Sequence, residues 1–106
     1  MYEDFFAKRL AHLRLKRNIS AREMSLSIGQ NSSYINRIEN GMTFPKMQVF
    51  FYICEYLNIT PQEFFDEQND NPEQIRTIEE DLKQLTDEQR QNIVDIIATF
   101  KKGNKA

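Results

Sequence analysis

The chain has 106 residues, 40% hydrophobic and 28% charged, which is typical of one compact domain with at most a short appendage. A single Cys and a single His exclude an intrachain disulfide and a cysteine-based zinc site. No apolar run approaches the roughly 18 residues that span a bilayer, and the first ten residues carry acids and aromatics early and not a basic region followed by an apolar one, so we do not expect secretion. We therefore expect a cytoplasmic protein with no membrane partner.

Helical periodicity dominates the sequence, and no segment alternates as a strand does. An S-x-x-E capping box at Ser20 starts one helix, and similar boxes follow at Thr60 and Thr86. Gly29 and Gly41 provide left-handed stops for two helices. The expected helices cover about 3–17, 21–28, 32–40 and 46–57, a short segment from Pro61, and then about 72–85 and 86–103. The predicted fold class is all-α.

A polar, acidic segment over residues 67–71 predicts a linker between a domain at 1–66 and a helical hairpin at 72–106. One hairpin can hardly bury the broad apolar stripe along its two helices. We therefore expect it to dimerise, with folding back onto the first domain as the alternative. The residues expected in the dimer interface are Ile75, Ile78, Leu82, Ile93, Ile97 and Phe100.

Charge is distributed unevenly along the chain, although the formal net charge is only −2. Residues 8–46 hold eight bases and two acids, whereas residues 66–106 hold six bases and ten acids. A basic half beside an acidic half indicates a nucleic-acid surface next to a region with a separate role. An ordinary solvated face is the alternative interpretation.

Residues 20–41 have the pattern of two short crossed helices joined by a tight turn. Apolar side chains at helical spacing face inward on both helices, and the small Ser25 lets the helices approach closely. The outer face of the second helix stays polar and has no acid before Glu39. A DNA-binding helix-turn-helix needs this arrangement, with its second helix in the major groove.

Specific motifs place this pattern in a known family. They are the L-x-x-L-R at Leu10 to Arg14, the cap at Ser20, Gly29 and the I-x-R-I-E-N-G run from Ile35 to Gly41. With them the chain resembles the phage repressor and Cro-type (XRE-like, lambda-repressor-like) helix-turn-helix domains over about residues 6–65. The resemblance implies five helices followed here by the two-helix hairpin. It also implies a transcription regulator, expected to be a repressor, that binds a pseudo-palindromic operator in double-stranded DNA as a homodimer.

Roles for individual side chains follow from their chemistry and from the resemblance. Base edges are expected to contact Ser32, Ser33, Asn36 and Arg37. The DNA backbone is expected to contact Arg22, Tyr34, Asn40, Thr43 and Lys46, with Lys8, Arg9, Lys16 and Arg17 as further candidates. The resemblance implies that Arg14 pairs with Glu39, and Gly29 and Gly41 have structural roles. The alternative for Arg37 is a surface salt bridge.

Other residues have plainer interpretations. Cys54 is expected to pack in the core, and His12 to lie on a helix surface. No nucleophile–base pair, phosphate loop or metal-ligand cluster is present in the sequence, so we expect no enzymatic activity, cofactor or metal. The alternative function is a protein-interaction module, antitoxin-like or regulator-binding, whose hairpin captures a partner protein while DNA binding is secondary.

Overall fold

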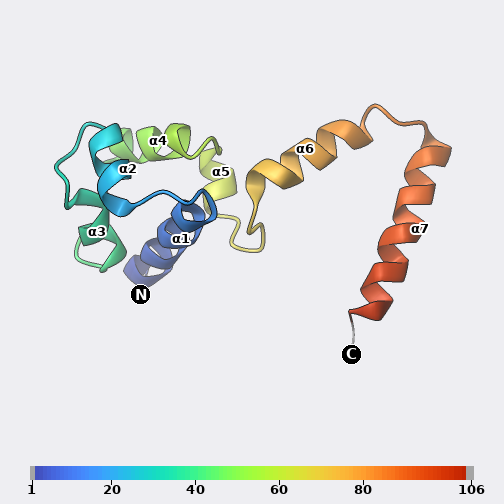
Figure 1. Ribbon diagram of the computed structural model, residues 1–106, viewed down its shortest axis with the longest axis horizontal. Helices are drawn as coiled ribbons and strands as arrows, with labels where there is room; N and C mark the ends of the chain where they lie inside the picture. The colour runs from blue at the N-terminus through green and yellow to red at the C-terminus, as the bar shows by residue number, and fades with distance from the viewer. Residues whose placement is uncertain (1, 105–106) are drawn as a thin grey trace. The chain divides into compact units, whose positions relative to one another are not determined.

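A computed structural model describes residues 2–104, which form seven α-helices and no strand (Figure 1). The helices are α1 (Tyr2–Lys16), α2 (Ala21–Ser27), α3 (Tyr34–Glu39), α4 (Met47–Tyr56), α5 (Pro61–Phe64), α6 (Pro72–Leu82) and α7 (Asp87–Gly103). The predicted all-α fold class is confirmed. Within the described range, no helix is both long enough and apolar enough to cross a membrane.

Helix starts follow the predicted capping signals. The hydroxyl of Thr60 accepts a hydrogen bond from the amide of Glu63, whose carboxylate accepts one from the Thr60 amide. Thr86 and Gln89 form the same reciprocal pair at α7. Ser20 accepts a hydrogen bond from the amide three residues ahead, at the start of α2. Each cap satisfies an amide that the first helical turn leaves without a backbone partner.

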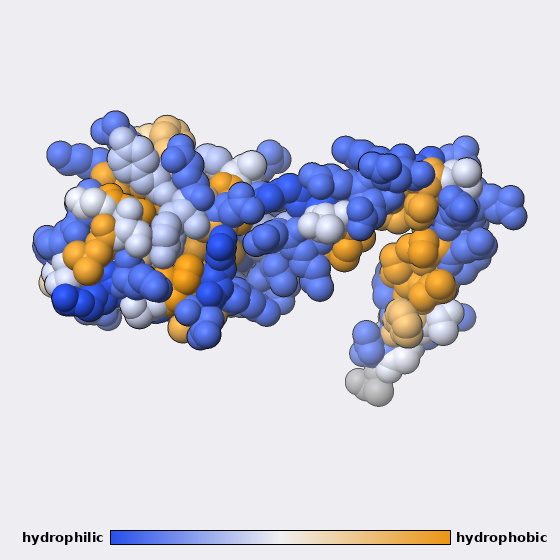
Figure 2. Space-filling view, turned by 45° about the horizontal axis from the view of Figure 1, so that its top comes forward, coloured by the Kyte–Doolittle hydropathy of each residue, from blue (hydrophilic) through white to orange (hydrophobic). Residues whose placement is uncertain are grey.

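The chain divides into two compact units, residues 1–73 and 74–106, and the boundary falls in the first turn of α6. In the second unit, Arg90 donates through Nη1 to the carbonyls of Leu82 (2.9 Å) and Leu85 (2.8 Å). These hydrogen bonds fix the turn that joins α6 to α7. No described residue of α7 is buried, and hydrophobic residues form a stripe along this helix (Figure 2).

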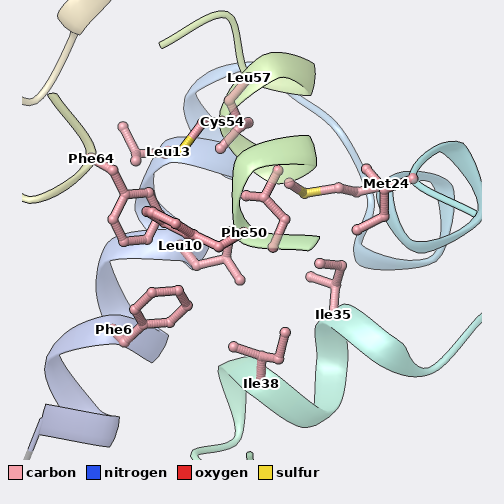
Figure 3. Packing of buried hydrophobic residues seen from close by; sticks show 12 residues of the cluster. Phe6, Leu10, Leu13, Met24, Ile35, Ile38, Phe50, Cys54, Leu57 and Phe64 are labelled. Carbon is pink, nitrogen blue, oxygen red and sulfur yellow. The ribbon is translucent and has the colours of Figure 1, made fainter. Parts of the chain in front are cut away.

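The core of the first unit is built around aromatic rings (Figure 3). The ring centroid of Phe6 lies 4.8 Å from that of Phe64, and Phe50 meets Phe64 edge-on at 5.1 Å. Helices α2 and α3 add aliphatic side chains to the same core, including Met24 and Ile35. Since these helices are too short to be stable alone, their packing on this core holds them in place.

Cys54 lies in this core, as its position in the sequence predicts. Burial raises the pKa of its thiol to about 11, and the neighbouring Glu55 carboxylate acts in the same direction. A buried thiol that stays protonated reacts slowly with thiol reagents. Cys54 is therefore a packing residue, and its labelling reports unfolding of the first unit.

Candidate nucleic-acid interface

Ser25 joins the two helices of the candidate interface. Its side chain is fully buried, and its hydroxyl donates to the carbonyl of Ala21 at 2.7 Å. The same oxygen accepts a hydrogen bond from the backbone amide of Ile35 at 2.9 Å. That amide lies in the first turn of α3, where helical amides have no backbone acceptor. Ser25 therefore does more than leave room for the close approach that its small size predicts, because it ties α3 to α2.

Replacing Ser25 with Ala is expected to lower the free energy of unfolding by about 1–3 kcal/mol, because the buried Ile35 amide loses its acceptor. Chemical unfolding of the full chain measures this change. Ser27→Ala, two residues along the same helix at an exposed position, is the matched control and should change stability little. An equal effect of both substitutions would contradict a tethering role for the Ser25 hydroxyl.

The turn between α2 and α3 begins at Gly29, whose φ of +78° is in the left-handed region that glycine adopts at little cost. Asn31 then accepts hydrogen bonds through Oδ1 from the amide (3.1 Å) and the hydroxyl (2.9 Å) of Ser33. Because this side chain holds the backbone in a turn, α3 begins at Tyr34. The sequence predicted that this helix begins near Ser32. In the structure it begins two residues later, and Ser32 and Ser33 precede it.

The predicted base-reading residues all lie on the surface of the first unit. Exposed positions are held by Ser32, Ser33, Asn36 and Arg37, while Ile35 and Ile38 on the opposite side of α3 are buried. Among the described residues, the guanidinium of Arg37 makes no ion pair or hydrogen bond, so the alternative of a surface salt bridge is not realised. Its five donors are available to an external acceptor.

Arg14 and Glu39 form the ion pair that the family resemblance implies. Nε of Arg14 lies 2.7 Å from Oε2 of Glu39, and Nη2 lies 2.8 Å from Oε1. Nη1 of Arg14 also donates to the carbonyl of Ile19 at 2.7 Å. The hydrogen bonds that Arg14 donates to the Glu39 carboxylate raise the pKa of its guanidinium despite partial burial. This bidentate pair fixes the end of α3 to α1 and neutralises the acid nearest to the polar face of α3.

The residues predicted to contact the DNA backbone differ in exposure. Arg22, Asn40 and Lys46 are exposed, with Lys46 directly before the first residue of α4. Thr43 is half-buried and donates from Oγ1 to the carbonyl of the next residue at 3.2 Å. Tyr34 is also half-buried against the core, and this burial raises the pKa of its hydroxyl. Gly41, between α3 and this loop, has φ +73°.

Arg9 does not belong to this surface, which corrects its inclusion among the candidate phosphate contacts. Only 5% of the residue is exposed, and its guanidinium donates to four backbone carbonyls within the first unit. The acceptors are Phe64 at 2.6 Å, Glu63 at 2.8 Å, Asp66 at 2.8 Å and Asn69 at 2.9 Å. Lys8, Lys16 and Arg17 remain exposed. His12 is half-exposed, as expected, with Nε2 3.3 Å from the carbonyl of Asp70.

The residues predicted to form a dimer interface lie on α6 and α7. In the described structure Ile75, Ile78, Ile97 and Phe100 are exposed, and Leu82 and Ile93 are half-buried. Val94 of α7, which was not predicted in this interface, is also exposed. Its position off the main apolar stripe explains that omission.

Comparison with known proteins bears on the first unit. A family of proteins described as helix-turn-helix domains matches residues 7–69, which is more than half of the chain. The match includes α2, the turn and α3 together with the helices that support them. Searches of curated proteins and of solved structures found no significant match.

Proposed function

The chain belongs to this family of helix-turn-helix domains, and on that premise we propose that it is a sequence-specific transcriptional regulator, acting as a repressor on double-stranded DNA. In this proposal α3 enters the major groove and the protein works in the cytoplasm. Two copies bind a pseudo-palindromic operator, because a two-fold dimer presents its helices to half-sites about 34 Å apart. Occupying DNA at a promoter is sufficient for repression.

The observation that carries the proposal is the polar outer face of α3, above all the guanidinium of Arg37, which makes no ion pair or hydrogen bond within residues 2–104. Arginine forms two parallel hydrogen bonds with O6 and N7 of guanine, and asparagine does the same with N6 and N7 of adenine. Asn36 lies beside Arg37 on the exposed side of the helix. The nearby carboxylate of Glu39 is occupied by Arg14, so it does not repel phosphates from this face.

Contacts to the DNA backbone come from residues around this face in the proposal. Arg22 and Lys46 provide charge, and Asn40, Thr43 and Tyr34 provide hydrogen-bonding groups. Ser32 and Ser33 precede α3, where short hydroxyl side chains can contact either a base or a phosphate. These contacts position the helix, whereas Arg37 and Asn36 give the sequence preference.

Arg37→Ala is expected to lose discrimination at one base-pair position of the operator, by about 1–3 kcal/mol. Duplexes selected from a random pool by the full chain provide the binding site, and titrations with each single-base variant give the discrimination. Arg37→Lys keeps the charge but lacks the planar fork of donors, so it should retain affinity better than preference. Lys46→Ala should weaken binding to all duplexes evenly and reduce the salt slope by about 1.

Lys83→Ala is the matched control, since it removes one exposed positive charge from the second unit. It should leave base preference and salt slope unchanged. Equal affinity of the unsubstituted chain for all duplexes, at every salt concentration, would contradict a sequence-specific regulator.

The exposed apolar stripe of α7 favours a second candidate function, a protein-interaction module of the antitoxin-like or regulator-binding kind. In that case the C-terminal helices capture a different protein, and DNA binding is secondary. A chain that shows no base preference but forms a stoichiometric complex with another protein would support this second function over the first.

A further inference from the structure

Helix α7 exposes apolar side chains that a stable protein normally covers. Exposed fractions are 50% for Ile96, 49% for Ile97 and 66% for Phe100, and Ile93 is half-buried on the same side of the helix. Figure 2 shows hydrophobic residues in a continuous stripe along this helix. At 100° per residue these four positions fall within one narrow face. A face of this kind marks an interaction site.

The two ends of α7 carry opposite charge. Asp87 and Glu88 lie in its first turn, and Lys101 and Lys102 lie in its last turn. Each group favours its own helix end, because the helix dipole is positive at the N-terminus and negative at the C-terminus. The helix is therefore complementary in charge to another copy of itself that runs in the opposite direction.

We propose that α7 pairs antiparallel with α7 of a second copy of this chain, with the centre of the contact between Ile96 and Ile97. This inference rests on the homodimer of the proposed function and specifies its interface. With that centre, Ile93 of one copy faces Phe100 of the other, and Ile96 faces Ile97. All four apolar side chains of the stripe are then covered at once.

Charge decides between the two possible directions of pairing. With the centre between Ile96 and Ile97, the acidic first turn of one copy lies about one helical turn from the basic last turn of the other at both ends of the contact, and Asp87 also pairs with Arg90 of its own copy at 2.7 Å. In a parallel arrangement Lys101 and Lys102 would lie beside the same lysines of the second copy, and the acids would likewise meet each other. Like charges at close range are unfavourable, and aligned helix dipoles add to this repulsion.

Helix α6 broadens the surface available to the second copy. Ile75 and Ile78 are exposed on it at the spacing of neighbouring helical turns. Two copies of the second unit then supply four amphipathic helices, an arrangement that buries apolar faces in a bundle.

Cross-linking of full-length single-cysteine variants tests the direction of pairing. Ile93→Cys and Phe100→Cys are prepared separately, one with a mass tag, and treated with a short thiol-to-thiol cross-linker alone and as a mixture. The native Cys54 is buried and stays silent in the folded chain. Cross-linked product is expected in the mixture and only at background in either variant alone. Product in each variant alone, with none specific to the mixture, would overturn the antiparallel arrangement.

Charge reversal keeps the inference testable if a cysteine disturbs the contact. Lys101→Glu with Lys102→Glu turns attraction into repulsion in an antiparallel dimer, so the dissociation constant should rise at least about tenfold. In a parallel dimer these changes replace one repulsion by another and leave the constant almost unchanged, which would contradict the inference. Addition of a chain carrying Asp87→Lys with Glu88→Lys should restore pairing.

The same measurements separate this inference from the proposed function. A chain that is dimeric and binds DNA specifically, yet gives no product in the cysteine mixture, overturns the α7 contact alone. The dimer interface would then be expected at an apolar groove of about 750 Å³ in the first unit. Phe5, Phe44, Met47 and Phe65 are among the residues that line it. A chain that stays monomeric overturns both the α7 contact and the homodimer, while base preference still tests the DNA-binding role separately.

Discussion

Replacing Arg9 with Met should lower the free energy of unfolding by about 3 kcal/mol or more. Methionine keeps the unbranched stem but removes every donor, so four carbonyls lose the Arg9 hydrogen bond, although those of Glu63 and Asp66 each keep a backbone amide donor. A buried acceptor that loses its donor costs about 1–3 kcal/mol, and the loss of a buried cationic donor lies at the upper end. Burial lowers the pKa of Arg9, while nearby carboxylates, Asp66 first among them, oppose this shift.

Urea unfolding of the full chain measures this loss, with Cys54 labelling as the specific reporter for the first unit. Lys8→Met is the matched control, because Lys8 is the exposed neighbour on the same helix and should contribute little. Arg9→Lys should give an intermediate loss, since an ammonium cannot reach acceptors spread over four residues as a guanidinium fork does. Equal stability of the Arg9→Met and Lys8→Met variants would show that these hydrogen bonds contribute nothing net.

The position of Arg9 explains why the first unit extends past α5. Its guanidinium holds the segment over residues 63–69 against α1, and Nζ of Lys16 lies 3.9 Å from Oδ2 of Asp70. The polar residues that predict a linker are thus attached to the first helix of the domain. Residues 66–70 carry no apolar side chain, so the backbone carbonyls of Asp66 and Asn69 provide the attachment.

Local sequence signals predicted much of the fold because each acts over a few residues. The caps at Thr60 and Thr86 and the left-handed residues Gly29 and Gly41 depend only on near neighbours. Apolar spacing likewise predicted the inward side chains of α2 and α3. The Arg14–Glu39 pair came from the family resemblance, since nothing in the spacing of 25 residues identifies it.

Long-range hydrogen bonds to backbone atoms could not be predicted in this way. Arg9 binds carbonyls 54 to 60 positions away, and a carbonyl is present at every residue, so the sequence contains no pattern for this contact. The small size of Ser25 predicts a close approach of the two helices, but nothing in the sequence predicts that its hydroxyl binds the Ile35 amide 10 positions away. The N-cap of α3 is Ser33, one residue later than the predicted start near Ser32, because Asn31 holds Ser33 in the preceding turn, and short polar side chains compete at such positions.

The bidentate pair between Arg14 and Glu39 should show strong coupling in a double-mutant cycle. Arg14→Met and Glu39→Gln are each expected to lower the free energy of unfolding by about 2–4 kcal/mol, because each leaves a poorly solvated partner without its opposite charge. Their side chains are only 12% and 11% exposed, so water replaces little of the lost interaction. The double variant should lose less than the sum of the two, by about 1–3 kcal/mol.

Urea unfolding of the four proteins gives this coupling energy, and DNA titrations of the same four test its consequence for binding. The pair attaches the end of α3 to α1, so Glu39→Gln should weaken specific binding although the carboxylate contacts no DNA in the proposed complex. Arg37→Ala should relax preference at one base pair, whereas Glu39→Gln should weaken binding to the selected site without changing which base is preferred. Additive losses of stability, with unaltered binding in both single variants, would show that α3 keeps its place without this pair and that the core contacts of Ile35 and Ile38 are sufficient.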